Sequence, residues 1–278
     1  MSVINSNIGS LYAQAALNAN ARGLATLMRQ LSTGKRISSS VDDIAGMAIS
    51  ARLTAQIRGL NQALRNTNDG VSLIQTADAA TAQVSAILQR MQELAVQASN
   101  STNNDDDRSY HNIEYVGLTT QINKIAESTE WAGTGVLNAA GGRAGVFSFQ
   151  VGANAGQTIS ITLPDIRTGT SSKLSTIANT VITDTTASSA AQGLLTSALD
   201  LVNLERANMG AVVSRLQFTG DNLSNMSVKS QESRSRIEDT DYALTASELT
   251  KRTLIQQAAQ AMLAQANQIP LLVLQLLK

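Results

Sequence analysis

Apolar residues recur at alternating spacings of three and four near both ends of the chain. This spacing places each set along one face of a helix. The two predicted faces are formed by Leu17, Ala21, Leu24, Met28 and Leu31 near the N-terminus, and by Ile255, Ala259, Met262, Ala266, Ile269 and Val273 near the C-terminus. Both faces are narrow and rich in alanine, and isolated helices gain little stability in water. We therefore predict that the two terminal helices pack against each other.

A longer helix is predicted on the inner side of each terminal helix. Gly34 and Ser38–Ser40 form a predicted linker, after which Asp42 and Asp43 mark the acidic start of the next helix. Three stretches then repeat the helical spacing: Leu53, Ile57, Leu60, Leu64, Thr67, Val71 and Ile74, continued by Val84, Leu88, Met91 and Ala95; Tyr115, Leu118, Ile122 and Ile125; and Leu195, Leu199, Val202, Met209, Val213, Leu216 and Leu223. No proline interrupts them, so we expect long coiled-coil-like seams.

The periodicity changes in the middle of the chain. Apolar and polar residues alternate over 147–151 and again over 159–163, and the glycine-containing segment 152–156 joins the two runs. This pattern predicts a β-hairpin. The segment 168–189 is rich in serine and threonine, and we expect it to form exposed surface.

These patterns together predict a mainly α fold. Long coiled-coil-like helices from both termini pack together, and a small β-hairpin is inserted in the middle. We expect residues 1–40 and 240–278 to form a terminal helical domain. Residues 41–239 are expected to form a long-helix bundle that carries the hairpin.

The composition excludes several classes of function. The formal net charge is zero, from 21 basic and 21 acidic residues, so no overall field attracts nucleic acid or an anionic membrane. The absence of cysteine excludes disulfides, thiolate catalysis and cysteine-ligated metals. The N-terminus lacks the pattern of a cleavable signal peptide. The apolar run from Ile269 to Leu277 is too short to span a bilayer, so no membrane insertion is expected.

Residues with chemical potential are few and scattered. His111, the single histidine, stands in a polar helix start, where we interpret it as a surface residue. The Gly34–Arg36 segment lacks the upstream glycine and following hydroxyl of a phosphate loop. The Asp105–Asp107 segment lacks the alternating ligands of a calcium loop, and acids before a helix stabilise its positive end. We expect no catalytic, cofactor-binding or metal site, and we do not expect an enzyme.

Five segments resemble a known family. The segments 31–37 (Leu-Ser-Thr-Gly-Lys-Arg-Ile) and 42–49 (Asp-Asp-Ile-Ala-Gly-Met-Ala-Ile) are similar to the N-terminal block of bacterial flagellins, and 89–98 is similar to the next block. Segments 235–243 and 262–268 resemble the C-terminal blocks. The resemblance covers nearly everything outside the middle of the chain and keeps the family's order.

The resemblance implies a structural subunit of the extracellular bacterial flagellar filament. Flagellins pass unfolded through the type III export apparatus, bind a chaperone through their C-terminal part, and polymerise with themselves under a cap protein into a hollow tube. By this resemblance, 1–40 and 240–278 would form the inner filament core and 41–239 the outer shell. The stretch 166–190 is too short for the further outer domains of larger members. The apolar Leu271-Leu272-Val273 departs from the family's polar residues there, which leaves the packing near the channel open.

The resemblance also implies a contact with the vertebrate Toll-like receptor that senses flagellin. Gln89, Arg90, Leu94 and Glu114 match the family's contact positions, while the two residues after Arg90 depart from the usual pattern. From the residues alone, Leu94 indicates helix packing and Arg90 an exposed charge. These residues can serve in both roles.

Other structural proteins are alternatives to a flagellin. A secretion-needle subunit would be much shorter and would lack a hairpin. A hook–filament junction protein, or another accessory flagellar or surface protein, would share the helical termini, although the segments 89–98 and 262–268 favour flagellin. A membrane-surface helix over 255–277 is disfavoured, because the only basic residue beside this segment is Lys278.

Overall fold

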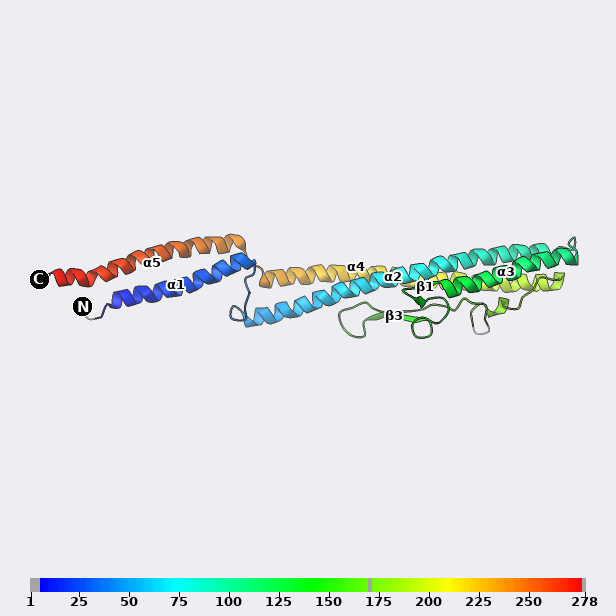
Figure 1. Ribbon diagram of the computed structural model, residues 1–278, viewed down its shortest axis with the longest axis horizontal. Helices are drawn as coiled ribbons and strands as arrows, with labels where there is room; N and C mark the ends of the chain where they lie inside the picture. Colours follow the sequence, from blue (N-terminus) through cyan, green and yellow to red (C-terminus); the bar gives the residue numbers. More distant parts are fainter. Residues whose placement is uncertain (1–5, 170–171, 277–278) are drawn as a thin grey trace. The chain divides into compact units, whose positions relative to one another are not determined.

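The computed structural model describes residues 6–169 and 172–276, and it describes side chains up to Gln268 (Figure 1). The helices are α1 (Ile8–Thr33), α2 (Ile44–Ser99), α3 (Asp105–Ser128), α4 (Thr185–Glu238) and α5 (Tyr242–Leu276). Long helices from both ends of the chain pack together, and the β-structure lies in the middle of the sequence, so the predicted fold class is confirmed.

The chain divides into two compact units. The terminal unit contains the residues up to Ile57 together with those from Val228 onward, and the central unit is Arg58–Ser227. Both boundaries fall inside the long helices α2 and α4. The expected division at 40/41 and 239/240 concerns layers of an assembly, and it stays a prediction.

The helix ends follow from local side-chain chemistry. Asn7 accepts a hydrogen bond from the Ser10 N–H at 3.1 Å and begins α1, and Gly34, with a φ of 70°, ends it in the left-handed conformation that glycine favours. Asp43 begins α2 by accepting from the Gly46 N–H at 2.9 Å. Asp105–Asp107 form the first turn of α3, where their negative charges stabilise the positive end of the helix.

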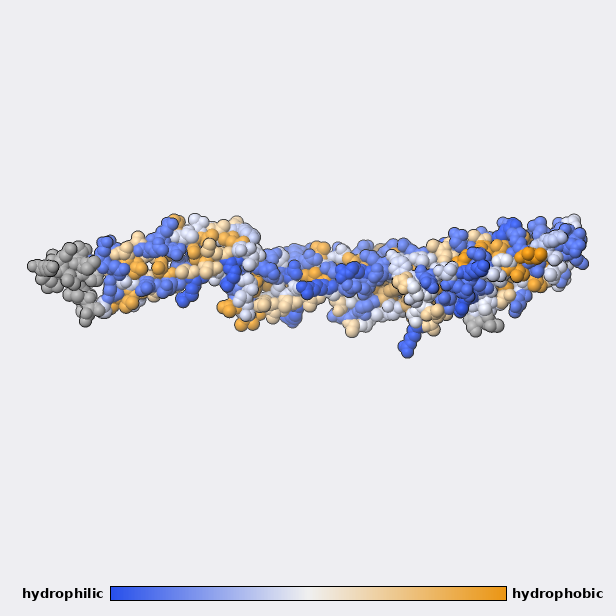
Figure 2. Space-filling model, in the orientation of Figure 1, coloured by the Kyte–Doolittle hydropathy of each residue, from blue (hydrophilic) through white to orange (hydrophobic). Residues whose placement is uncertain are grey.

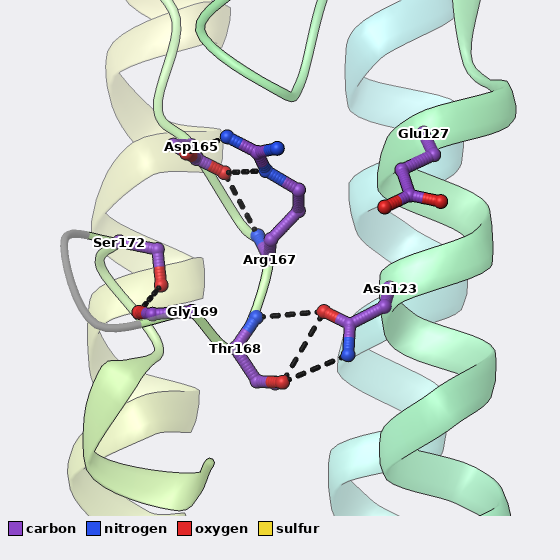
Figure 3. Close-up of a pocket in the computed structure, with 7 residues that line it drawn as sticks. All are labelled: Asn123, Glu127, Asp165, Arg167, Thr168, Gly169 and Ser172. Carbon is purple, nitrogen blue, oxygen red and sulfur yellow. Dashed lines mark hydrogen bonds and ion pairs between the residues drawn. The ribbon is translucent and has the colours of Figure 1, made fainter.

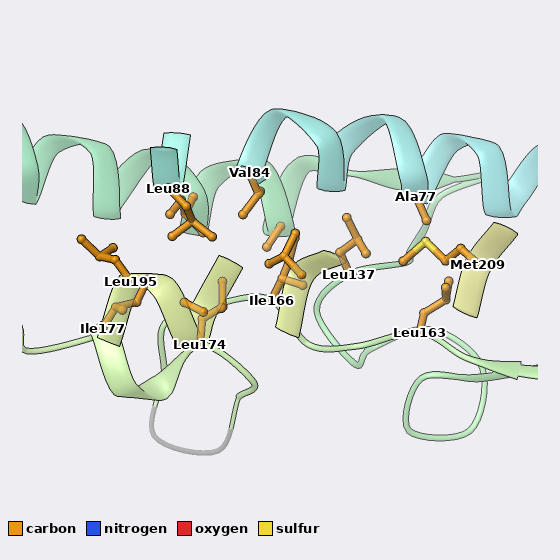
Figure 4. Packing of buried hydrophobic residues seen from close by; sticks show 14 of the residues in the cluster. Ala77, Val84, Leu88, Leu137, Leu163, Ile166, Leu174, Ile177, Leu195 and Met209 are labelled. Atoms are coloured by element: carbon orange, nitrogen blue, oxygen red, sulfur yellow. The ribbon is translucent and has the colours of Figure 1, made fainter. Parts of the chain in front are cut away.

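The core of the central unit is a seam of aliphatic side chains between α2, α3 and α4. Most of the apolar positions predicted for these helices lie in or against this core, and those fully buried include Ile74, Leu88, Met91, Ile122, Leu195 and Met209. Figure 4 shows α2 residues such as Val84 and Leu88 facing Leu195 from α4, with Leu137, Ile166 and Leu174 filling the space beside them. The predicted long seams are confirmed.

The predicted hairpin is formed by β3 (Val146–Gln150) and β4 (Thr158–Thr162). Phe147 pairs with Ile161 and Phe149 with Ile159, so the apolar members of both strands share a face. A second, smaller hairpin is formed by β1 (Glu130–Trp131) and β2 (Thr134–Gly135). The sequence did not predict it, because strands of two residues carry no readable alternation.

The expectation of exposed surface over 168–189 is wrong for several of its residues. Leu174, Ile177 and Ile182 are fully buried in the core of the central unit, and Leu174 directly precedes the 3-10 helix Ser175–Ile177. These isolated apolar residues anchor the polar segment, and the helical part of it, from Thr185, already belongs to α4.

Candidate assembly interface

Helices α1 and α5 lie side by side and antiparallel, and we call them the terminal pair (Figure 1). Half-buried apolar residues at heptad spacing mark the facing sides: Leu17, Leu24 and Leu31 on α1, and Leu249, Ala259, Leu263 and Ala266 on α5. The seam is shallow, since none of these side chains reaches the burial of the central core. Packing within a single chain therefore gives this pair little stability.

Polar contacts tie α1 to the backbone of α5. The Asn20 side chain, 8% exposed, donates to the Arg252 carbonyl at 2.9 Å, and Asn7 donates to the Ala266 carbonyl at 2.8 Å. Tyr242 donates from its hydroxyl to the Leu31 carbonyl at 3.2 Å. These contacts step backward along α5 as they step forward along α1, which fixes one register. A buried asparagine in a coiled-coil seam specifies register in the same way.

The guanidinium of Arg252 lies over Gly23 on α1. A side chain at position 23 would require Arg252 to move. The same guanidinium contacts Glu248 at 3.3 Å. The missing side chain at Gly23 of α1 thus leaves space for the long side chain of Arg252 on α5.

Where α1 ends and α5 begins, the two segments are joined by a set of contacts that we call the clasp. The Thr240 N–H donates to the Gly34 carbonyl at 3.0 Å, and the Arg36 guanidinium donates to the Ile237 carbonyl at 2.7 Å. Lys35 forms an ion pair with Glu238. The hydrogen bond from Lys35, followed by one from Ser50, lowers the pKa of Glu238 below its ordinary value.

The terminal pair leaves many large apolar side chains uncovered within the single chain. We call them the uncovered apolar set; its members, each 45% to 75% exposed, are Ile8, Leu11, Tyr12, Met28, Leu244, Leu254, Ile255 and Met262. Figure 2 shows apolar side chains, in orange, on the surface of these two helices. Clusters of exposed apolar side chains of this kind mark interaction surfaces.

The residues predicted for the polymerisation seam fall into three groups. Those half-buried in the pair are Leu17, Leu24, Leu31, Ala259 and Ala266. Those exposed are Ala21, Met28, Ile255 and Met262, and the side chains of Ile269 and Val273 lie outside the described residues. Sequence reasoning missed Asn20, Gly23 and Arg252. Asn20 stands three residues after Leu17 and four before Leu24, and this spacing was the available signal.

The residues matched to a receptor contact lie close together on α2 and α3. Arg90 is paired with Glu114 at 3.0 Å and with Glu93 at 2.9 Å, and Gln89 is exposed beside it. Leu94 is only 1% exposed and belongs to the core. Gln89, Arg90 and Glu114 are thus available to a partner, while Leu94 holds α2 in place.

A polar cavity of about 450 Å³ lies between α3 and the segment after β4 (Figure 3). Several of its polar groups are bonded to one another: Asn123 accepts from the Thr168 N–H at 2.8 Å, and Arg167 contacts Asp165 at 2.7 Å. The hydrogen bond from Arg167 chiefly lowers the pKa of Asp165. The lining contains no histidine or cysteine, and the Asp165 carboxylate is engaged by the Arg167 guanidinium.

The described part of the chain offers neither a metal-binding cluster nor a membrane-spanning helix. Within residues 6–169 and 172–276, no three or more histidine, cysteine or acidic side chains are grouped so that they could hold a metal ion. Within those ranges, no helix combines the length and the apolar character needed to cross a bilayer. His111 is half-buried on α3.

Comparisons with known proteins agree with this architecture. Residues 4–141 match the family model of the bacterial flagellin N-terminal helical region, and residues 193–277 match that of the C-terminal helical region. The chain is 41% identical to a flagellin of Halalkalibacterium halodurans over 99% of this chain and 100% of the relative. It is 35% identical to a flagellin of Listeria monocytogenes over 99% of both. A solved structure from Vibrio parahaemolyticus, assigned to the flagellar hook-associated proteins, shares the fold with a TM-score of 0.60 at 15% identity, over 71% of this chain and 100% of that one.

Proposed function

The chain belongs to the bacterial flagellin family, and from this premise we propose that its terminal pair drives polymerisation. Members of this family are structural subunits of the extracellular flagellar filament, and this chain is one of them. The observation that carries the proposal is the uncovered apolar set on α1 and α5. In the filament, copies of the chain bury these side chains against one another.

The gain from such burial is large relative to the weak pairing within one chain. Full burial of an exposed Leu, Ile or Met is worth roughly 1.5–3 kcal/mol. Met262 is 66% exposed and Leu254 is 61% exposed, so most of that gain remains to be made on assembly. Folding of the terminal pair and addition of a subunit are then one coupled step.

The proposed layers follow the two ends of the chain. Residues 1–40 and 240–278 form the inner core around the channel, and 41–239 form the outer shell. The segment between β4 and α4 is short and is anchored by Leu174, Ile177 and Ile182. This anchoring supports a filament subunit without additional outer domains.

The proposed partners beyond the chain itself come from the family. They are the type III export apparatus, a flagellin chaperone acting on the C-terminal part, and the filament cap protein. A chain without cysteine suits export in an unfolded form, because no thiol can mispair. For the flagellin-sensing Toll-like receptor we propose a contact made by Gln89, Arg90 and Glu114, with Leu94 supporting the helix from inside.

We also propose that the chain carries no catalytic activity of its own. The flagellins are a structural protein family. The polar cavity beside α3 supports this proposal, because Asp165 and Asn123 in its lining are engaged by Arg167 and Thr168.

A hook–filament junction role is the second candidate, favoured by the shared fold with the Vibrio parahaemolyticus structure. At 15% identity that likeness concerns the fold alone. The 41% identity to a flagellin along the full chain favours the filament subunit.

A charge at Met262 tests the proposal. Met262→Glu is expected to abolish polymerisation, because a carboxylate would have to enter an apolar contact. Gln260→Glu, at an exposed position two residues earlier on the other side of α5, is the matched control and should polymerise. Sedimentation onto filament seeds measures both, and circular dichroism checks that the central unit stays helical. Normal filaments from Met262→Glu would contradict the proposal.

A further inference from the structure

An exposed apolar patch lies where α2 begins, outside the terminal pair. Val41 is 90% exposed, Ile44 76% and Met47 45%. We call these three residues the loop patch. Ile44 and Met47 are three residues apart at the start of α2 and therefore share a helix face. Figure 2 shows orange side chains at the start of this helix.

The loop that carries Val41 is held in one conformation. Asp42 accepts hydrogen bonds from the N–H groups of Ser38 at 3.1 Å and Ser39 at 3.0 Å. It also pairs with Arg29 of α1 at 3.2 Å. The hydrogen bond from the Ser38 backbone chiefly keeps the pKa of Asp42 below its ordinary value. The carboxylate thus acts as a fixed anchor of the loop.

The neighbouring apolar residue of the same loop is buried. Ile37 is 6% exposed and lies over Gly46, at a distance that leaves no room for a side chain there. The loop therefore turns Ile37 inward and Val41 outward. A rigid apolar surface of this kind loses little conformational entropy when a partner covers it.

The symmetry of a filament indicates what covers the patch. A contact between two identical patches closes into a dimer, whereas a contact between two different surfaces of the same chain repeats without closing. The terminal unit carries two different exposed apolar surfaces, the loop patch and the uncovered apolar set. Both lie in the same compact unit, joined through the Arg29–Asp42 ion pair.

We propose that the loop patch docks onto the uncovered apolar set of the terminal pair of a neighbouring copy of this chain. The inference rests on the proposed function and deepens it, because it names the second surface of the polymerising contact. Arg29 and Asp42 position the patch, and Val41 and Ile44 make the contact.

The first test removes the apolar contact without disturbing the fold. The double variant Val41→Ser/Ile44→Ser is expected to raise the critical concentration for growth on parent filament seeds about 100-fold, about tenfold for each residue. Val181→Ser, an exposed apolar residue of the central unit, is the control and is expected to change it less than about twofold. A critical concentration equal to that of the parent in the double variant would overturn the inference.

The second test identifies the covering surface. Because the natural chain has no cysteine, one population can carry Val41→Cys and a second can carry a cysteine at Leu11, Met28, Leu254 or Met262. In mixed filaments, disulfides between Val41→Cys and at least one of these four are expected. Cross-links of Val41→Cys only with itself, or with none of the four, would overturn the inference.

Failure of the inference is distinguishable from failure of the proposed function. If the loop variants polymerise normally while Met262→Glu does not, the terminal pair still drives assembly and the loop patch does not contribute. If Met262→Glu also polymerises normally, the proposed function fails with it.

Discussion

Asn20 gives the sharpest test of how the terminal pair is held in register. Asn20→Ala removes the hydrogen bond from the side chain to the Arg252 carbonyl, 2.9 Å long in the structure. A hydrogen bond of this kind contributes about 0.5–1.5 kcal/mol net. The Arg252 carbonyl lies inside α5 and keeps its helical partner, so the loss is that of the bond alone.

The substitution has an opposing effect that must be removed from the comparison. Alanine is a better helix former than asparagine by about 0.5 kcal/mol, which by itself favours α1. Asn18→Ala introduces the same gain two residues away, at an exposed position. The relevant quantity is therefore the difference between the two variants, and the parent chain alone is the wrong reference.

The assay is the critical concentration for growth on parent filament seeds, read by sedimentation. Asn18→Ala should lower it about twofold, the equivalent of about 0.5 kcal/mol. Asn20→Ala should then require about two to twelve times the concentration of Asn18→Ala. Equal critical concentrations for the two variants would refute the register role of Asn20.

Three further predictions concern the central unit and the clasp. Leu174→Ala should lower the free energy of unfolding by about 2–5 kcal/mol in denaturant titrations, because Leu174 is fully buried; a loss under about 0.5 kcal/mol would show that the segment is not part of the core. Arg108→Ala should cost about 1–3 kcal/mol in the same assay, since Arg108 donates to the Ala98 carbonyl at 3.0 Å and pairs with Asp105 at 3.1 Å; a free energy of unfolding equal to that of the parent would contradict this. The lowered pKa of Glu238 means that its contribution is present above the ordinary carboxyl pKa of 4.5 and is lost as the pH falls through its folded value. Filaments of Glu238→Gln should therefore dissociate at lower temperature than the parent at neutral pH, with the difference vanishing on acidification; a difference that persists in acid would refute the linkage.

Heptad spacing predicted the helices because their buried faces obey it. Leu60, Ile74 and Leu88 were assigned to the inner face of one long helix, and all three are buried. The predicted hairpin followed from strict alternation over two runs of five residues. Where many residues repeat one period, the pattern predicts the element even if single positions depart from it.

The misses occur where one or two residues decide the structure. Leu174 and Ile177 are isolated apolar residues in a polar segment. The serine- and threonine-rich composition of the segment predicted exposure, although both residues are buried. Asn20 faces α5, although an apolar pattern prefers its neighbour Ala21 for that place. The uncovered apolar set could not be separated from the half-buried seam by sequence, because both surfaces are apolar and only packing distinguishes them.

The most direct test of the account removes the terminal helices. The intact chain and a chain lacking residues 1–40 and 240–278 are concentrated onto seeds and followed by sedimentation and electron microscopy. The intact chain is expected to form long filaments, and the trimmed chain is expected to stay a soluble, helical monomer. Filaments from the trimmed chain, or an intact chain that remains soluble, would contradict assembly through the terminal pair.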